Sequence, residues 1–115
     1  GLTRPVFPEV TLSLGKVPLC RYGTPSTYEL SDSMLPYIDF AWALLLENHG
    51  AVTFGKCIKG AFFRMEKLEW AAHTISVART IGREKSIPHN KLKELYSISE
   101  EVYGIKIDKR NRFDY

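Results

Sequence analysis

Cysteine is scarce in this sequence, which contains only Cys20 and Cys57. The two lie far apart and form no C-x-x-C pair, so the sequence indicates neither a disulfide framework nor a zinc knuckle. Long apolar runs are absent too, since no stretch approaches the roughly 20 apolar residues of a membrane span, and we expect no secretory leader. These absences predict reduced thiols in a cytoplasmic protein that does not associate with membranes.

Strong charge of one sign is also missing. The net charge is only +3, and no dense Lys/Arg run is interleaved with aromatic residues as on a nucleic-acid-binding surface. We therefore expect no nucleic-acid partner. Part of the positive charge lies in the tail, which we interpret as a solvated chain end, with a polyanion site as the alternative: Lys106, Lys109, Arg110 and Arg112.

What is present is typical of one soluble domain. The chain has 115 residues, of which 44% are apolar and 25% are charged, enough for a modest hydrophobic core. No internal repeat or low-complexity stretch occurs. The first residue is Gly instead of Met, so we expect either a tag remnant or a piece of a longer protein.

The region from Trp42 to Gly55 organises the rest of the chain. The apolar run Leu44-Leu45-Leu46 leads into a polar corner at Glu47-Asn48-His49-Gly50, and Ala51-Val52-Thr53-Phe54 follows. Apolar and β-branched residues on both sides of a glycine-containing corner predict a β-hairpin. His49 then lies at the hairpin tip, held by rigid elements, which is an arrangement that suits a metal ligand.

The residues before the hairpin predict less regular structure. Pro5 and Pro8 argue against a central strand, so we expect an extended first segment with at most one short strand or turn. Residues 17–22 predict a strand. The sequence Ser26-Thr27-Tyr28-Glu29 fits a capping box that begins a helix running from about Thr27 to Leu35.

Two helices are predicted after the hairpin. Apolar residues recur every three or four positions from Ile58 to Ile81, just before Gly82, and predict a long helix. Its expected apolar face comprises Ile58, Ala61, Phe62, Met65, Leu68, Ala72 and Ile75. A second amphipathic helix is predicted from His89 to Val102, with Gly104 as its C-terminal stop. We expect an α/β fold, a layered sandwich with a mainly antiparallel sheet flanked by helices.

Three motifs occur in a defined order: Val17-Pro-Leu-Cys-Arg-Tyr-Gly-Thr-Pro-Ser-Thr-Tyr-Glu-Leu30, then Leu44-Leu-Leu-Glu-Asn-His-Gly-Ala-Val52 with Gly55, then a helix with Ala61, Glu66, Glu69 and Ala72. Together they resemble the class II aldolase/adducin family, and within it most of all the zinc lyases that act on L-fuculose 1-phosphate. The resemblance runs from about Leu2 to Gly104 but covers only the later half of a family member. It implies that residues 1–115 are the C-terminal portion of a single class II aldolase/adducin domain.

The resemblance implies a sugar-phosphate aldolase that requires Zn2+ or another divalent metal. Such an enzyme cleaves a ketose 1-phosphate such as fuculose 1-phosphate into dihydroxyacetone phosphate and an aldehyde, and the metal stabilises the enediolate that forms. His49 matches the third zinc histidine of the family. The other two, a His-x-His pair, and the catalytic glutamate are absent from this sequence, so the chain alone is expected to be inactive. Epimerase or dehydratase chemistry on a related sugar phosphate is an alternative.

Tyr103 is the candidate catalytic residue. The segment from Tyr103 to Lys106 matches a family segment in which a tyrosine on a mobile tail reaches the active site of an adjacent subunit, and a phenol can donate a proton. Packing on the apolar helix face is the alternative role. A second family tyrosine corresponds to about Thr11, where this chain has none. Family members are typically homotetramers, which implies that the long helix and the tail take part in assembly.

The other polar residues near His49 have weaker assignments. Glu47 shares a strand face with His49 and is a candidate for orienting the metal site, while Arg21 and Tyr22 are expected at its rim. His73 and His89 are interpreted as a helix-surface residue and a connector residue. A non-catalytic, adducin-like interaction module is the alternative from a different functional class, and an upstream His-x-His pair would distinguish the two.

Overall fold

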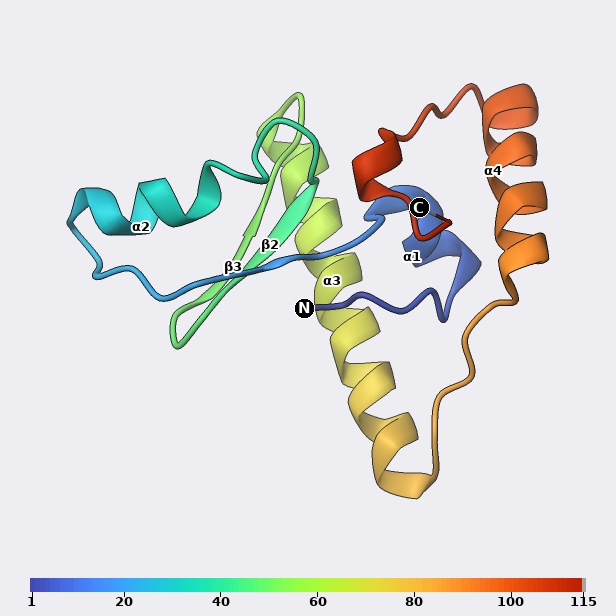
Figure 1. The fold of residues 1–115 in the computed structure, drawn as a ribbon, viewed down its shortest axis with the longest axis horizontal. Helices are drawn as coiled ribbons and strands as arrows, with labels where there is room; N and C mark the ends of the chain where they lie inside the picture. Colours follow the sequence, from blue (N-terminus) through green and yellow to red (C-terminus); the bar gives the residue numbers. More distant parts are fainter. Residues whose placement is uncertain (115) are drawn as a thin grey trace.

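The computed structural model describes residues 1–114, in which short strands alternate with helices (Figure 1). The elements in chain order are α1 (Pro8–Ser13), β1 (Leu19–Cys20), α2 (Tyr28–Met34), β2 (Ala43–Leu46), β3 (Gly50–Thr53), α3 (Ile58–Ile81), α4 (His89–Tyr103) and the 3-10 turn η1 (Lys109–Asn111). Layers of helices flank a small sheet, which confirms the predicted α/β class.

The sheet is mixed and has the strand order β1-β2-β3. Strands β2 and β3 form the predicted hairpin, with Leu46 opposite Gly50. Strand β1 runs parallel to β2, with Leu19 opposite Leu45. A parallel neighbour requires a crossover connection, and α2 lies within that connection. The outer sides of β1 and β3 are therefore the two edges of the sheet.

Alternation along β2 divides the core into two layers, because successive strand residues point to opposite faces. Ala43 and Leu45 belong to the cluster that packs against α1 and α3, together with Val10, Leu14 and Leu68. Leu44 and Leu46 belong to the cluster on the α2 face, whose other members are Cys20, Ala41, Leu30, Met34, Tyr37, Phe40, Val52 and Phe54. The sheet is thus covered on both faces.

The C-terminal tail packs back onto the start of the chain instead of extending into solvent. Ile107 is buried with Leu92 and Tyr96 of α4. The fully buried Asn111 donates a side-chain hydrogen bond to the Leu14 carbonyl (3.1 Å). Of the tail cations predicted to face water, Lys106, Lys109 and Arg110 are exposed and Arg112 is half-buried, although the backbone that carries them packs against the fold.

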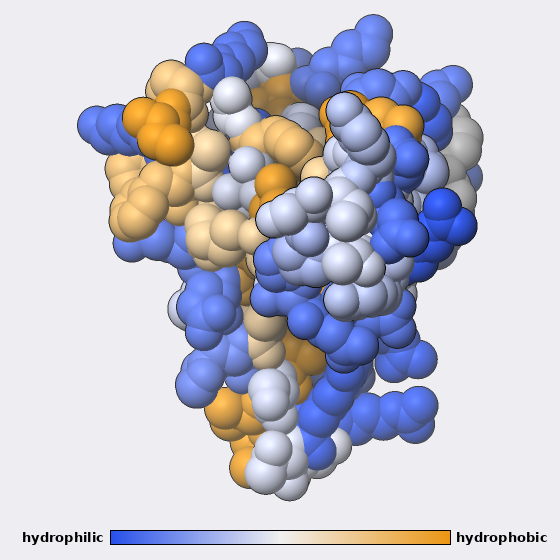
Figure 2. All heavy atoms as spheres, turned by 90° about the vertical axis from the view of Figure 1, so that its left-hand side faces the viewer, coloured by the Kyte–Doolittle hydropathy of each residue, from blue (hydrophilic) through white to orange (hydrophobic). Residues whose placement is uncertain are grey.

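Helix α3 begins and ends at the predicted residues, but its buried face differs from the predicted one. Leu68, Ala71 and Ile75 are buried, whereas Ala72 is exposed. Ile58 is 86% exposed, because the sheet and α1 cover only one side of the helix. Its other exposed apolar residues are Phe62, Phe63, Trp70, Val77 and Ile81. Figure 2 shows apolar surface gathered near the top of the molecule and again near its lower end, the heights at which α3 begins and ends in Figure 1.

The first segment contains a short helix that the sequence analysis did not predict. Pro8 stands at the first turn of α1, where its fixed φ favours a helix and its missing N–H costs nothing. Val10 and Leu14 then both point into the core. Only Leu2 makes a strand-like contact, an isolated bridge to Val17. The expectation of an extended segment is wrong for residues 8–13.

The predicted capping box at the start of α2 is also absent. The N-cap is Thr27, without a side-chain cap bond, and Ser26 has a left-handed φ of 65°. The Glu29 carboxylate accepts a hydrogen bond from the Thr24 backbone N–H (3.2 Å) instead, which lowers its pKa. Glu29 therefore stabilises the turn before the helix and not the first turn of the helix itself.

Candidate functional site

His49 lies in the tight turn between β2 and β3, as the sequence predicts. Its backbone N–H donates to the Leu46 carbonyl (3.1 Å), and Asn48 before it adopts a left-handed φ of 53°, which asparagine tolerates better than most residues. His49 itself is exposed. The hairpin thus presents the imidazole at the edge of the molecule, available to groups outside this chain.

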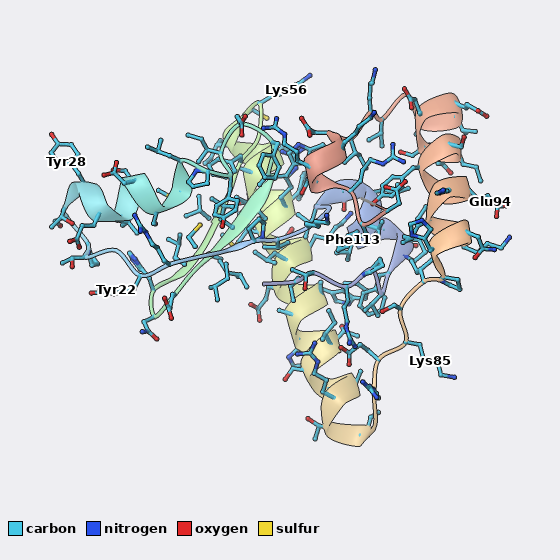
Figure 3. All side chains as sticks on the ribbon, viewed as in Figure 1. Tyr22, Tyr28, Lys56, Lys85, Glu94 and Phe113 are labelled. Carbon is cyan, nitrogen blue, oxygen red and sulfur yellow. The ribbon has the colours of Figure 1, made fainter. Side chains whose placement is uncertain are left out.

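Glu47 connects the hairpin to the segment after β1. Its carboxylate accepts a hydrogen bond from the Tyr22 backbone N–H (2.9 Å), and its own N–H donates to the Cys20 carbonyl (3.2 Å). In Figure 3, Tyr22 lies close to the turn of the hairpin. Arg21 and Glu47 also line a cavity of about 570 Å³ between β1 and α2. Glu47 therefore holds the backbone around Tyr22. It does not share a strand face with His49, because β2 ends at Leu46 and β3 begins at Gly50, and its action on His49 stays a prediction.

The residues of this chain do not by themselves fit a three-ligand metal site. Within residues 1–114, no group of three or more His, Cys, Asp or Glu residues lies close enough to hold a metal ion. His73 is exposed on α3, and His89 is the first residue of α4. Both agree with their interpretation as a surface and a connector residue. His49 is left as a single candidate ligand.

Tyr103 is the last residue of α4 and is 65% exposed. The end of α4 and the β2–β3 turn lie on opposite sides of the molecule (Figure 1). A single copy of the chain therefore does not bring Tyr103 and His49 into one site. Its exposure also argues against the alternative that Tyr103 packs on the apolar face of α4.

One group of functional candidates was not assembled by the sequence analysis, which named only Lys106 of it, among the tail cations with a polyanion site as their alternative role. Arg64, Lys67 and Lys106 line a cavity of about 750 Å³ together with aromatic residues. These residues come from α3 and from the tail, which lie about 40 positions apart in the sequence. No local motif signals such a site, because only the folded tail closes it.

Comparison with known proteins finds a family model that matches the first part of the chain. Residues 3–76 match the class II aldolase and adducin N-terminal domain, which is well over half of the chain. The chain belongs to the class II aldolase/adducin family. The match includes the whole hairpin with His49 and most of α3, so the predicted resemblance is confirmed at the family level.

The relatives within the class II aldolase/adducin family carry out more than one reaction. A 3-oxo-tetronate 4-phosphate decarboxylase from Pectobacterium atrosepticum is 35% identical over 74 residues, which cover 64% of this chain and 34% of that protein. A 5-deoxy-D-ribulose 1-phosphate aldolase from Bacillus thuringiensis is 31% identical over 74 residues, or 64% and 35% of the two chains.

Solved structures of the family agree with the fold. The crystal structure of YgbL from Escherichia coli, a candidate aldolase/epimerase/decarboxylase, matches with a TM-score of 0.71 and 30% identity over 80% of this chain and 44% of that chain. YgbL from Klebsiella pneumoniae gives a TM-score of 0.73 at 28% identity, over 81% and 44% of the two chains. The present chain thus spans only about a third of the length of its curated relatives and less than half of these structures.

Helix α3 has 24 residues, yet no helix within residues 1–114 is long and apolar enough to cross a membrane.

Proposed function

We propose that this chain is part of a class II aldolase-family lyase that breaks a carbon–carbon bond beside the carbonyl group of a sugar phosphate. The observation that supports this best is the match over residues 3–76, which includes the hairpin with the exposed His49 at its tip. The specific form of the proposal is retro-aldol cleavage of a ketose 1-phosphate such as fuculose 1-phosphate. The protein would be cytoplasmic, in keeping with two free thiols.

Decarboxylation of a phosphorylated 3-oxo sugar acid is the second candidate, because the decarboxylase relative has 35% identity and the aldolase relative 31%. The two reactions share one chemical demand. Each leaves an electron pair on the carbon next to a carbonyl, and the carbonyl oxygen takes up that charge as an enolate. A site that stabilises this oxygen serves either reaction, so the substrate decides between the two.

In the proposed enzyme, His49 contributes one ligand of a divalent metal such as Zn2+, and Tyr103 acts as a proton donor. The remaining ligands would come from the part of its relatives' length that this chain does not span. Because the end of α4, with Tyr103, and the β2–β3 turn, with His49, lie on opposite sides of one copy, the tyrosine would serve a neighbouring subunit. The exposed apolar side of α3 supports such an assembly, which we propose to be a homotetramer.

The test compares the activity of the chain alone with the activity of a longer protein that contains it. The purified chain, with its mass of 13.1 kDa verified, is incubated with Zn2+ and either L-fuculose 1-phosphate or 3-oxo-tetronate 4-phosphate. We expect no turnover, because one histidine does not complete a three-ligand site. Turnover by this species, free of any longer one, would show that the account of the incomplete ligand set is wrong.

A longer protein that carries this sequence together with an upstream His-x-His pair should convert one of the two substrates. His49→Ala should abolish both its activity and its bound metal. His73→Ala is the matched control, because His73 is also exposed but lies on α3, and it should retain both. A longer protein without the pair and without activity would instead support the adducin-like interaction module.

A further inference from the structure

A basic cavity lies between four segments of the chain. It has a volume of about 750 Å³ and is lined by Leu12 and Ser13 of α1, by residues 38–42 before β2, by residues 54–56 with the first turns of α3, and by Ile105 and Lys106 of the tail. In Figure 1 the loop before β2, the start of α3 and the first residues of the tail lie in the upper part of the molecule, whereas the β2–β3 turn lies at the lower left. Four cationic side chains and one carboxylate contribute to the lining: Lys56, Arg64, Lys67, Lys106 and Asp39.

Arg64 is held in a fixed position within this cavity. Its Nη1 donates to the Phe54 carbonyl, and its guanidinium lies 4.7 Å from the centroid of the Trp42 ring. A hydrogen bond and a cation–π contact together restrain the planar group. Because one of its N–H groups is used by Phe54 and the guanidinium has five, Arg64 retains donors for an anion.

The single carboxylate of the lining is paired with a cation. Asp39 forms an ion pair with Arg110 of η1 (2.8 Å), and Arg110 also pairs with Asp108 (2.9 Å) and lies over the Phe40 ring. These contacts raise the pKa of Arg110 further, so it stays charged. The nearby guanidinium therefore weakens the repulsion between Asp39 and an anion that enters the cavity.

Two lysines add charge without a competing partner. Lys67 lies one helical turn after Arg64 on the same face of α3, and Lys106 faces the cavity from the tail. Within residues 1–114, neither lysine side chain makes an ion pair or hydrogen bond. Lys56 lies at the rim, since its side chain points outward in Figure 3. The wall that carries Lys106 is fixed by the neighbouring buried Ile107.

We propose that the basic cavity binds a small organic anion, in which a phosphate or carboxylate group is joined to an apolar or aromatic group. Arg64, Lys67 and Lys106 would contact the anionic group through charge-assisted hydrogen bonds. The apolar part would pack against Trp42, Phe54 and Phe63. The volume lies within the range of small-molecule sites, which combine apolar walls with a few polar groups.

Fluorescence of Trp42 provides the test. The chain has two tryptophans, so a Trp70→Phe background leaves Trp42 as the only one. Phenyl phosphate, benzoate, inorganic phosphate and phenol are titrated into this protein. Phenyl phosphate should change the fluorescence in a saturable manner and bind more tightly than inorganic phosphate, and added salt should weaken it. Tighter binding of phenyl phosphate than benzoate would assign the anionic group as phosphate, and the reverse order as carboxylate.

Substitutions of the two unpaired lysines test the contacts directly. Lys67→Gln and Lys106→Gln should each weaken phenyl phosphate binding by about three- to fivefold, and the double variant by about tenfold or more. Lys93→Gln on the exposed side of α4 is the matched control and should bind like the parent. These variants avoid Arg64, whose bond to Phe54 supports the fold.

The proposal is wrong if neither phenyl phosphate nor benzoate gives a saturable change, or if phenol binds as tightly as both of these anions. It is also wrong if the double lysine variant binds like Lys93→Gln. Circular dichroism spectra that match the parent would show that the variants are folded, so that weaker binding reports the lost charges.

Discussion

Gly15 and Gly104 offer a matched test of how the tail is held. Both have left-handed backbones, with φ values of 65° and 63°. A Cβ added to Gly15 would lie 2.5 Å from Asn111 Nδ2 and 2.6 Å from Asn111 O, whereas a Cβ on Gly104 would meet no atom within 4 Å. The two alanine variants therefore share the backbone cost and differ in crowding.

This difference in crowding sets the loss of stability that we expect for each variant. Alanine in a left-handed conformation costs about 1–2 kcal/mol at either position. Gly15→Ala must also displace Asn111, whose amide donates to Leu14 (3.1 Å) and whose carbonyl accepts from Lys16 (3.0 Å). Leaving one such buried group without a partner costs about 1–3 kcal/mol more. We expect losses of about 2–5 kcal/mol for Gly15→Ala and about 1–2 kcal/mol for Gly104→Ala.

Urea denaturation followed by circular dichroism gives the free energy of unfolding of each variant. An Asn111→Ala variant completes a double-mutant cycle with Gly15→Ala. If Gly15 acts through Asn111, the two losses should fall short of additivity, because the same hydrogen bonds are lost in both. Equal losses for Gly15→Ala and Gly104→Ala, or full additivity in the cycle, would refute the reasoning.

Three further substitutions test the packing and the ion pairs. Hydrogen bonding by Arg79 lowers the pKa of Glu84 from 4.5 to about 2. The Glu84 carboxylate therefore stabilises the fold above pH 4.5 and loses that effect as the pH falls towards 2. The Glu84→Gln variant should have a lower urea midpoint than the parent at pH 7 and the same midpoint near pH 2. Tyr96→Phe removes the hydroxyl that accepts from the Phe113 N–H (3.0 Å) and should cost about 0.5–1.5 kcal/mol in urea denaturation, with an unchanged midpoint arguing against that bond. Leu44→Ala, at a side chain that is 0% exposed, should cost about 2–5 kcal/mol and lower the thermal midpoint; a loss under about 1 kcal/mol would contradict the assigned core.

Local signals in the sequence were sufficient for the second half of the fold. Helix α3 was predicted from Ile58 to Ile81 because its apolar residues repeat over many turns and Gly82 ends them. Gly104 ends α4 in the left-handed conformation that glycine favours. The hairpin followed from β-branched residues around a polar corner. Each of these signals lies within the element that it predicts and does not depend on distant parts of the chain.

The structure of the first segment was harder to predict, because its pattern of apolar residues fits both a strand and a helix. Val10, Leu12 and Leu14 alternate as in a strand, but Val10 and Leu14 also stand four apart as in a helix, and Pro8 at the helix start favours the second. The apolar face of α3 was misjudged for another reason. Ile58 and Phe62 fit the helical repeat, yet which of the apolar positions become buried depends on where the sheet and α1 lie.

The candidate sites likewise include one that the sequence predicts and one that it does not. The position of His49 in the turn was predictable, since it depends on the hairpin alone. The basic cavity was not predictable, because Arg64 and Lys106 come to line the same cavity only after the tail folds back. The metal and catalytic roles of His49 and Tyr103 stay predictions.

The bond between Asn111 and Leu14 joins residues 97 positions apart, and this separation has a consequence for biosynthesis. A ribosome releases the chain from its N-terminus, so α1 and the sheet emerge well before the residues that complete their packing. Until residues 107–113 leave the exit tunnel, the Leu14 carbonyl lacks its native partner and α4 lacks part of its buried contacts. We expect nascent chains to remain sensitive to protease until synthesis has passed these residues, so the packing of α1 and α4 should be completed only after residues 107–113 have been made.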